Sequence, residues 1–197
     1  MILALMSRGA VSLSLFGLVT AGAVALTQVV TADRIDDNRE ALARAALTAV
    51  LPAHDNAILD NQVTLAIGGT DTAVTIGRLG DDVSGYALST VANDGYSGPI
   101  TLVIGLTPGG TISGVRVTEH RETPGLGDKI DLNKSDWVLG FEGASLDNRT
   151  WGVKPDGGDF DAFTGATITP RAVTGAIART LTWYRDEGAA QLTGSKP

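Results

Sequence analysis

The sequence predicts an α+β protein with one N-terminal transmembrane helix and a single following domain, in which flanking helices accompany a mostly antiparallel sheet. Three observations predict this class. Residues 9–32 form an uncharged apolar run. Between residues 63 and 119, short segments with alternating apolar residues are separated by glycine-containing turns, which is typical of strands. An amphipathic segment follows near the C-terminus, so strands precede helices along the chain.

The uncharged run is long enough to cross a membrane. As a helix its 24 residues span about 36 Å, more than the roughly 30 Å hydrocarbon core of a bilayer. A cleaved signal peptide is the alternative, with Arg8 as its charged region and Ala21-Gly22-Ala23 as its cleavage site. Because the apolar run continues well past that site, we favour a retained anchor behind a short segment over residues 1–8.

The orientation of the anchor follows from the size of the domain behind it. One basic residue precedes the span and three follow within twenty residues, which by itself opposes an outside domain. Charge bias governs loops of up to roughly 60 residues, however, and longer domains translocate largely regardless of charge. We therefore expect a single-pass membrane protein with its main domain outside the cytoplasm.

A helical connector is predicted over residues 33–52, because apolar residues repeat at helical spacing and Pro52 stops the run. The domain is expected over residues 53–190, with a frayed end beyond Gly188 and a flexible tail over 191–197. Its predicted strands cover residues 63–67, 73–78, 86–91, 100–106, 111–119 and 150–154. The clearest hairpin joins 100–106 to 111–119, because its turn contains Pro108, Gly109 and Gly110.

Two helices are predicted after the hairpin. Asn133 or Ser135 can cap a short helix that carries Trp137, Val138 and Phe141. The last helix has Thr169 as its predicted N-cap and Pro170 at its first position, and runs to about Asp186. Its apolar residues stand four apart, at Val173, Ile177, Leu181 and Tyr184.

Composition excludes several kinds of function. The chain of 197 residues is 43% hydrophobic and 19% charged, as in a globular domain. Fifteen basic and 22 acidic residues give a net charge of -7, so we expect no nucleic acid partner. The chain has no cysteine, which excludes thiol catalysis, disulfides, Cys-ligated zinc and iron–sulfur clusters within it. Two isolated histidines give no reason to expect a metal site; His120 is expected as a solvated residue at a strand end.

Small and hydroxyl-bearing residues precede the last helix, in the run Asp161-Ala162-Phe163-Thr164-Gly165-Ala166-Thr167. Unpaired backbone N–H groups and the positive end of the helix dipole meet at such a helix start, and together they favour a phosphate. A threonine-rich cap that binds nothing is the alternative.

This run resembles the D-x-x-[ST]-G-A-[ST] motif of proteins that carry FMN as a phosphoester on the final Ser or Thr. Residues 94–98, 115–130 and 157–160 extend the resemblance, which covers nearly the whole chain. In all of these the sequence resembles the G subunit of the Rnf (Rsx) electron-transport complex, and it is similar to the C subunit of the sodium-translocating NADH:quinone reductase. A partial copy of the motif at residues 174–176 is followed by Ile177, which has no acceptor hydroxyl.

The resemblance implies an FMN-binding domain in which Thr167 is the covalent attachment residue. It implies that Asp161, Thr164, Gly165 and Ala166 are read by a flavin transferase that uses FAD and a divalent metal. The expected function is that of a redox subunit, in a membrane complex that couples electron transfer between ferredoxin and NAD to ion translocation. The resemblance also implies the bacterial inner membrane as its location, with the main domain on the periplasmic side. No catalytic residue is expected, because the isolated chain would not turn over alone.

Other membrane subunits are the partners that the resemblance implies, and small residues at Gly17, Gly22 and Ala25 would let helices pack closely. Two alternatives remain. The chain could be the quinone reductase subunit or a stand-alone periplasmic FMN carrier, or it could be an anchored scaffold domain without redox activity.

The flavin ring is expected beneath the loop of Thr123, Pro124, Gly125, Leu126 and Gly127. The loop's glycines permit close approach, and its backbone N–H groups could face negative charge on the flavin. An ordinary surface turn is the alternative. Four aromatic residues are candidates for an apolar wall, although each is individually more typical of plain core: Trp137, Phe141, Trp151 and Phe163.

Overall fold

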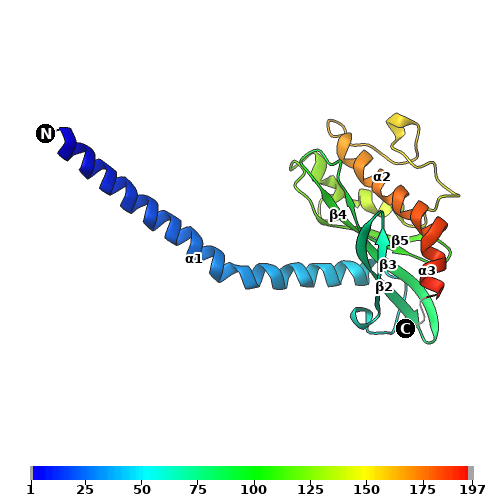
Figure 1. The fold of residues 1–197 in the computed structure, drawn as a ribbon. Coiled ribbons are helices and arrows are strands. Elements are labelled where there is room, and N and C mark those ends of the chain that lie inside the picture. Colours follow the sequence, from blue (N-terminus) through cyan, green and yellow to red (C-terminus); the bar gives the residue numbers. More distant parts are fainter. Residues whose placement is uncertain (1, 195–197) are drawn as a thin grey trace. The chain divides into compact units, whose positions relative to one another are not determined.

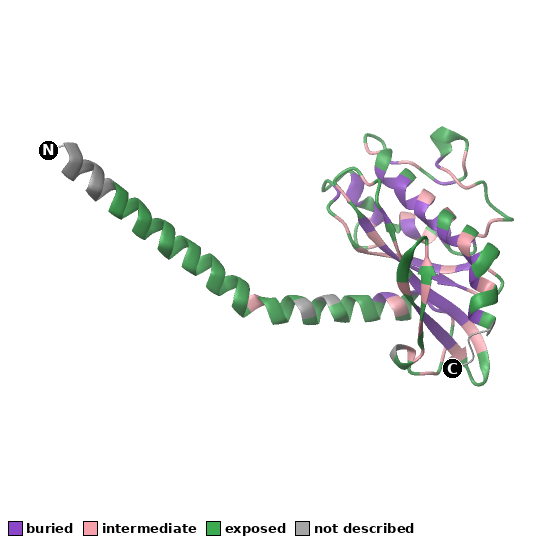
Figure 2. Ribbon diagram, in the orientation of Figure 1, coloured by how far each residue is buried: buried purple, intermediate pink, exposed green. Residues whose placement is uncertain are grey.

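The computed structural model describes residues 2–194, and the chain divides into two compact units between Leu42 and Ala43 (Figure 1). The first unit is formed by most of helix α1 (Ile2–Val50). Its side chains from residue 10 onward are almost all exposed (Figure 2), including apolar ones such as Phe16 and Leu18. The apolar part of α1 is long enough to cross a membrane, which agrees with the predicted transmembrane helix.

The second unit is built on a five-stranded antiparallel sheet whose strands are neighbours in chain order. The strands are β1 (Gln62–Ile67), β2 (Thr70–Leu79), β3 (Asp82–Ala92), β4 (Ile100–Leu106) and β5 (Ile112–Glu119). Every strand predicted between residues 63 and 119 is found. The predicted β4–β5 hairpin is confirmed, with Gly110 at φ 78° in its turn. The structure therefore confirms the α+β class and its antiparallel sheet.

The strand predicted over residues 150–154 is wrong. Val153 makes one isolated bridge to Phe160, and the next three residues form the 3-10 turn η4 (Lys154–Asp156). Pro155 has no N–H group and cannot donate to a ladder, which favours the turn. Two more short 3-10 turns lie elsewhere in the unit, η1 (Ile58–Asp60) and η2 (Gly127–Ile130).

The short helix predicted near residue 135 is the 3-10 helix η3 (Asp136–Phe141). Ser135 caps it by accepting a hydrogen bond of 3.2 Å from the Trp137 backbone N–H. Asn133, the other predicted cap, donates instead to the Asp131 carboxylate. Of the two predicted caps, only Ser135 is confirmed.

The last long helix, α2 (Ile168–Trp183), begins two residues earlier than predicted, and Thr167 is its N-cap. Thr169 lies inside the first turn, where its hydroxyl is buried and hydrogen-bonded to the Glu122 carboxylate. The prediction of Thr169 as N-cap and Pro170 as first helical residue is therefore wrong, because a distant carboxylate takes the hydroxyl that local capping would use.

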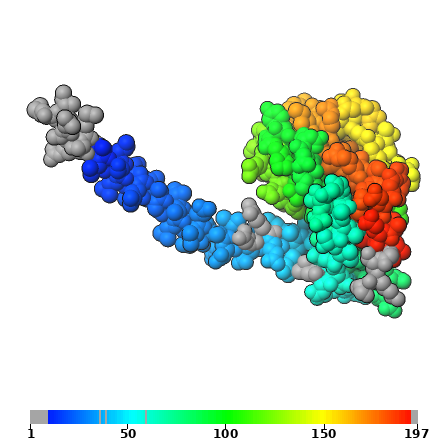
Figure 3. All heavy atoms as spheres, in the orientation of Figure 1, coloured from blue at the N-terminus to red at the C-terminus, as the bar shows by residue number. Residues whose placement is uncertain are grey.

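The C-terminal segment continues further in helical form than predicted. After α2 come a π-helical turn, η5 (Tyr184–Gly188), and the short helix α3 (Ala189–Gly194). Leu192 is buried in the main core rather than part of a frayed end, since apolar burial stabilises this last turn. Figure 3 shows the C-terminal segment, in red, against the first strands, in cyan and green. Residues 195–197 of the predicted tail lie outside the described part, and the exact domain limits stay predictions.

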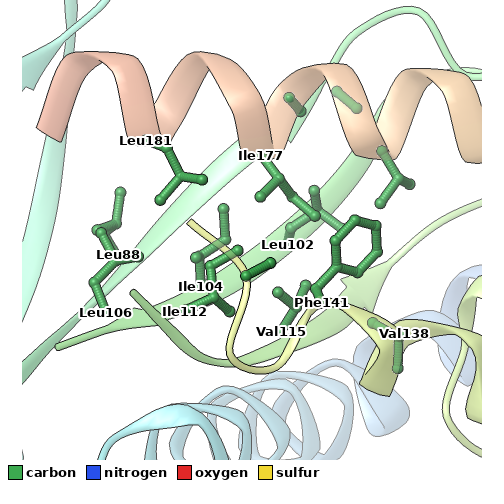
Figure 4. Close-up of a cluster of buried hydrophobic side chains, with 14 of the residues drawn as sticks. Leu88, Leu102, Ile104, Leu106, Ile112, Val115, Val138, Phe141, Ile177 and Leu181 are labelled. Atoms are coloured by element: carbon green, nitrogen blue, oxygen red, sulfur yellow. The ribbon is translucent and has the colours of Figure 1, made fainter. Parts of the chain in front are cut away.

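Helix α2 covers one face of the sheet and closes the main core (Figure 4). Ile177 and Leu181 of α2 pack with Leu88, Leu102 and Ile104 of the sheet, and all five are almost fully buried. Burial of each such side chain contributes about 1.5–3 kcal/mol. This packing fixes the start of α2 relative to the loops at the same end of the sheet.

The other face of the sheet receives the last residues of α1. Val50 packs with Ala87 and Val103 of the sheet, and its carbonyl oxygen accepts a hydrogen bond of 2.5 Å from the Ser113 hydroxyl. Glycine is required beneath it, because a Cβ on Gly105 would overlap that same oxygen. The chain entering the domain is therefore seated directly on the sheet backbone.

Candidate functional site

A cavity of about 310 Å³ lies where the start of α2 meets two loops. Its volume is at the lower end of the range for small-molecule sites. Three chain segments contribute to its lining: Tyr96 after β3, four residues between 122 and 127 after β5, and residues 165–169 around the start of α2. Ten residues form the lining: Tyr96, Glu122, Thr123, Leu126, Gly127, Gly165, Ala166, Thr167, Ile168 and Thr169.

A tight turn presents the residues before α2. The Ala166 N–H donates to the Phe163 carbonyl over 3.0 Å, and Gly165 has φ 81°. A left-handed residue at this position is typical of a type II turn and favours glycine. Thr164 and Gly165 are exposed at the tip of the turn.

Thr167 combines a cavity position with an available side chain. It is exposed, and as N-cap of α2 it has helical backbone angles and makes no side-chain capping hydrogen bond. Its carbonyl already accepts from the Arg171 N–H at 3.4 Å, so the residue starts the helix ladder. The hydroxyl thus stands at the positive end of the α2 dipole, on a cavity wall, without a capping role.

The loop after β5 is closed by its own hydrogen bonds. The Thr123 carbonyl accepts from the N–H groups of Leu126 and Gly127, both over 3.1 Å. The Gly125 N–H donates to the Asp128 carboxylate over 2.8 Å, and Gly125 has φ 79°. Three N–H groups of the loop thus donate within the loop itself, and a flavin beneath the loop stays a prediction.

A buried carboxylate stands behind this loop. Glu122 is 4% exposed, and its Oε1 accepts from the Ser97 backbone N–H over 2.9 Å. Its other oxygen, Oε2, accepts from the Thr169 hydroxyl. The Glu122 N–H donates to the Nδ1 atom of His120, which is half-buried after the end of β5 rather than fully solvated. One side chain thus joins all three segments of the cavity wall.

Gly127 is tied to the same arrangement. A Cβ on Gly127 would lie 2.8 Å from the Thr169 hydroxyl oxygen and 2.9 Å from Glu122 Oε2. Real Cβ atoms do not approach other atoms so closely, so only glycine lets the loop pass over this pair.

The structure brings six of the predicted site residues to the cavity: Thr123, Leu126, Gly127, Gly165, Ala166 and Thr167. The remaining four, Asp161, Thr164, Pro124 and Gly125, are not among the described residues of its lining. Asp161 forms an exposed ion pair of 2.6 Å with Lys154. These four residues therefore shape or flank the two loops rather than the cavity wall.

The predicted aromatic wall belongs to the core. Trp137, Phe141, Trp151 and Phe163 pack in the main cluster, and the Trp137 ring contacts the Phe141 and Phe163 rings at centroid distances of 5.1 Å. The cavity's aromatic residue is Tyr96, which is 68% exposed.

Sequence reasoning missed four lining residues: Tyr96, Glu122, Ile168 and Thr169. Tyr96 and Glu122 do lie in segments that carry the family resemblance. A carboxylate directly before the glycine-containing loop was the available signal for Glu122.

Nearly the whole chain matches known proteins of one kind. Residues 95–182 match the family model of the FMN-binding domain, and residues 1–50 match that of the RnfG N-terminal region. A protein of Pseudoalteromonas atlantica, named as the G subunit of an ion-translocating oxidoreductase complex, is 42% identical over 97% of this chain and 94% of its own length. Proteins of the same name in Pseudomonas aeruginosa and Vibrio cholerae are 48% and 45% identical, over 91% and 86% of this chain and 88% and 85% of theirs.

Proposed function

This chain belongs to the RnfG family, the G subunits of ion-translocating oxidoreductase complexes, and from that premise we propose that it carries one FMN as a phosphoester on Thr167. Membership makes it an electron-transfer subunit of an Rnf-type complex, with an FMN-binding domain and a candidate membrane helix. We further propose that the complex couples electron transfer between ferredoxin and NAD to ion translocation. The observation that carries the flavin proposal is that Thr167 is exposed, lines the cavity and makes no capping hydrogen bond with its side chain.

The residues around Thr167 fit the attachment chemistry. Its hydroxyl oxygen would bond to the phosphorus of the FMN half of FAD, the bond from that phosphorus to the bridging oxygen would break, and AMP would leave. The hydroxyl proton is released in the same reaction. The ester keeps one negative charge, which the N-terminus of α2 can stabilise through its dipole and unpaired N–H groups.

Other residues of the cavity suit the ring of a flavin. FMN supplies the ability to accept and donate electrons. Tyr96, Leu126 and Ile168 are large apolar residues that line the cavity yet remain 68%, 43% and 44% exposed. They offer contact surface to a planar ring at the cavity mouth. A covalent link makes retention independent of binding affinity, which suits a site outside the cytoplasm, where FMN would diffuse away.

Maturation requires a second protein. We propose that an FAD-dependent flavin transferase reads Asp161, Thr164, Gly165 and Ala166. The first three are exposed, and Ala166 is half-buried. The turn is already formed in the folded domain, so the enzyme would meet it as a structured surface. Other membrane subunits would pack against α1, where a Cβ on Gly17 or Gly22 would meet nothing within 4 Å.

The attachment is tested by mass spectrometry of the full chain, expressed together with the transferase. We expect the mass to increase by one FMN less one water, with fluorescence that persists in a denaturing gel. Thr167→Ala should lose the label, and Thr167→Ser should keep it because the hydroxyl is retained. Thr182→Ala, which removes another exposed hydroxyl of α2, is the matched control. An unmodified native protein would leave only an anchored scaffold domain.

The proposed periplasmic orientation has its own test. An alkaline phosphatase fusion after Pro197 should be active, because that enzyme folds to its active form outside the cytoplasm. An inactive fusion, together with an active cytoplasmic reporter at the same site, would reverse the orientation without affecting the flavin assignment.

A further inference from the structure

We propose that Glu122 is a positioning residue that joins the three wall segments of the cavity and keeps the reduction potential of a flavin there low. The proposal rests on the proposed function, because it concerns a flavin held at Thr167. Glu122 differs from other carboxylates of the domain in combining burial, a place in the cavity lining and hydrogen bonds to both neighbouring segments.

The positioning role follows from the hydrogen bonds. Oε1 holds the Ser97 N–H at 2.9 Å, next to Tyr96 on the cavity wall. Oε2 holds the hydroxyl of Thr169, two residues after Thr167. Ser97 and Thr169 are each far from Glu122 in sequence, so neither local turn chemistry nor the sheet ladder replaces these contacts. Loss of the carboxylate would remove the link that Glu122 makes between the segment of Tyr96 and Ser97 and the first turn of α2.

The electrostatic role follows from the nature of the partners. Both donors, a backbone amide and a hydroxyl, are neutral groups, so they solvate the carboxylate without cancelling its charge. A buried charge is weakly screened and acts more strongly than one on the surface. Reduction adds electrons to the flavin, and a fixed negative charge in the wall opposes that addition. The reduction potential of the bound flavin is therefore lowered.

Glu122→Gln separates this charge from the side chain's shape. Glutamine is nearly isosteric, and its amide oxygen can still accept from Ser97 while its amide group contacts Thr169. We expect the flavinylated fraction of this variant, identified by its mass, to have a more positive midpoint potential than the wild type in a spectroscopic redox titration. Glu187→Gln makes the same change of charge at an exposed position beyond the far end of α2, about 30 Å along the helix. Its midpoint potential should stay unchanged.

A second measurement needs no flavin. With selective labelling of serine nitrogen, the Ser97 amide proton of unmodified Thr167→Ala protein should move upfield when Glu122→Gln is added, because a charge-assisted hydrogen bond is weakened. An unchanged Ser97 signal, or an unchanged midpoint potential in a fully flavinylated Glu122→Gln protein, would overturn the proposal. Failure of the proposed function would give a different result, because the wild-type protein would then keep its unmodified mass.

Discussion

Gly165 provides a sharp test of why the attachment motif contains glycine. It has φ 81°, and a Cβ built on it would find its nearest neighbour, Leu126 Cδ2, at 3.8 Å. That distance is an ordinary van der Waals contact, so space for a methyl group is available. Gly165→Ala should therefore be unfavourable for a conformational reason alone, with a cost of about 1–2 kcal/mol for a left-handed residue with a Cβ.

The size of this cost predicts the effect on flavinylation. A change of about 1.4 kcal/mol alters an equilibrium constant tenfold. In Gly165→Ala the ratio of the formed turn to open conformations should therefore be roughly 5 to 30 times lower than in the wild type. At limiting transferase, the rate of FMN incorporation into Gly165→Ala should fall by a similar factor. The full chain in detergent should remain folded, since Gly165 lies at the exposed tip of the turn.

Gly165→Asn is the matched variant, because asparagine tolerates left-handed backbone angles better than other residues with a side chain. It should restore much of the incorporation rate, as measured by time-resolved mass spectrometry. Equal rates for Gly165→Ala and the wild type would refute the conformational reasoning. If both variants fold but neither accepts FMN, the transferase does not tolerate any side chain at residue 165, whatever the conformation of the turn.

Two further predictions concern stability of the full chain. In urea unfolding, Gly105→Ala should lower the free energy of unfolding by about 1–3 kcal/mol, because its Cβ would overlap the Val50 carbonyl oxygen. The control is Gly109→Ala, whose Cβ would have its nearest contact at 3.8 Å and whose free energy of unfolding should change by less than about 0.5 kcal/mol. Equal losses in the two variants would contradict the argument from close approach at Gly105. Burial raises the pKa of Tyr184 to about 12, with a smaller contribution from Tyr86, so its contribution to stability is fully present below about pH 10 and is lost as the pH rises through the folded value. The free energy of unfolding should fall less steeply over this range in Tyr184→Phe than in the wild type, and identical slopes would count against that assignment.

Local patterns were sufficient for most of the sheet. Alternating apolar residues and turn glycines predict the strands between residues 63 and 119, because antiparallel neighbours joined by short turns depend on contacts close in sequence. The failures occur where a distant group decides. Thr169 has the sequence features of an N-cap, yet Glu122, 47 residues away, takes its hydroxyl. Residues 150–154 read as a strand, yet among the described residues their pairing is one isolated bridge, from Val153 to Phe160.

The candidate site divides in the same way. The motif before α2 predicts Thr167 as the attachment residue, and the structure places this residue in the cavity lining at the start of the helix. Glu122 and Tyr96 could not be assigned to the site from the sequence. Glu122 is held in the wall by hydrogen bonds to Ser97 and Thr169, which are distant in sequence. Tyr96 reaches the cavity because the fold brings the segment after β3 next to the start of α2. The internal hydrogen bonds of the loop after β5 were missed for a related reason. A sequence shows that a glycine loop has donors, but not that its own Thr123 carbonyl uses them.

On the proposed function, the shallow cavity and the covalent link explain each other. A site of about 310 Å³ with a largely exposed Tyr96 at its mouth buries only part of a ligand as large as FMN, so affinity alone would hold it weakly. Once Thr167 carries the phosphate, the wall no longer has to provide that affinity. A buried negative charge at Glu122, which would weaken binding of an anionic ligand, then becomes tolerable, and it can serve to adjust the potential while the exposed mouth leaves the ring accessible for electron exchange.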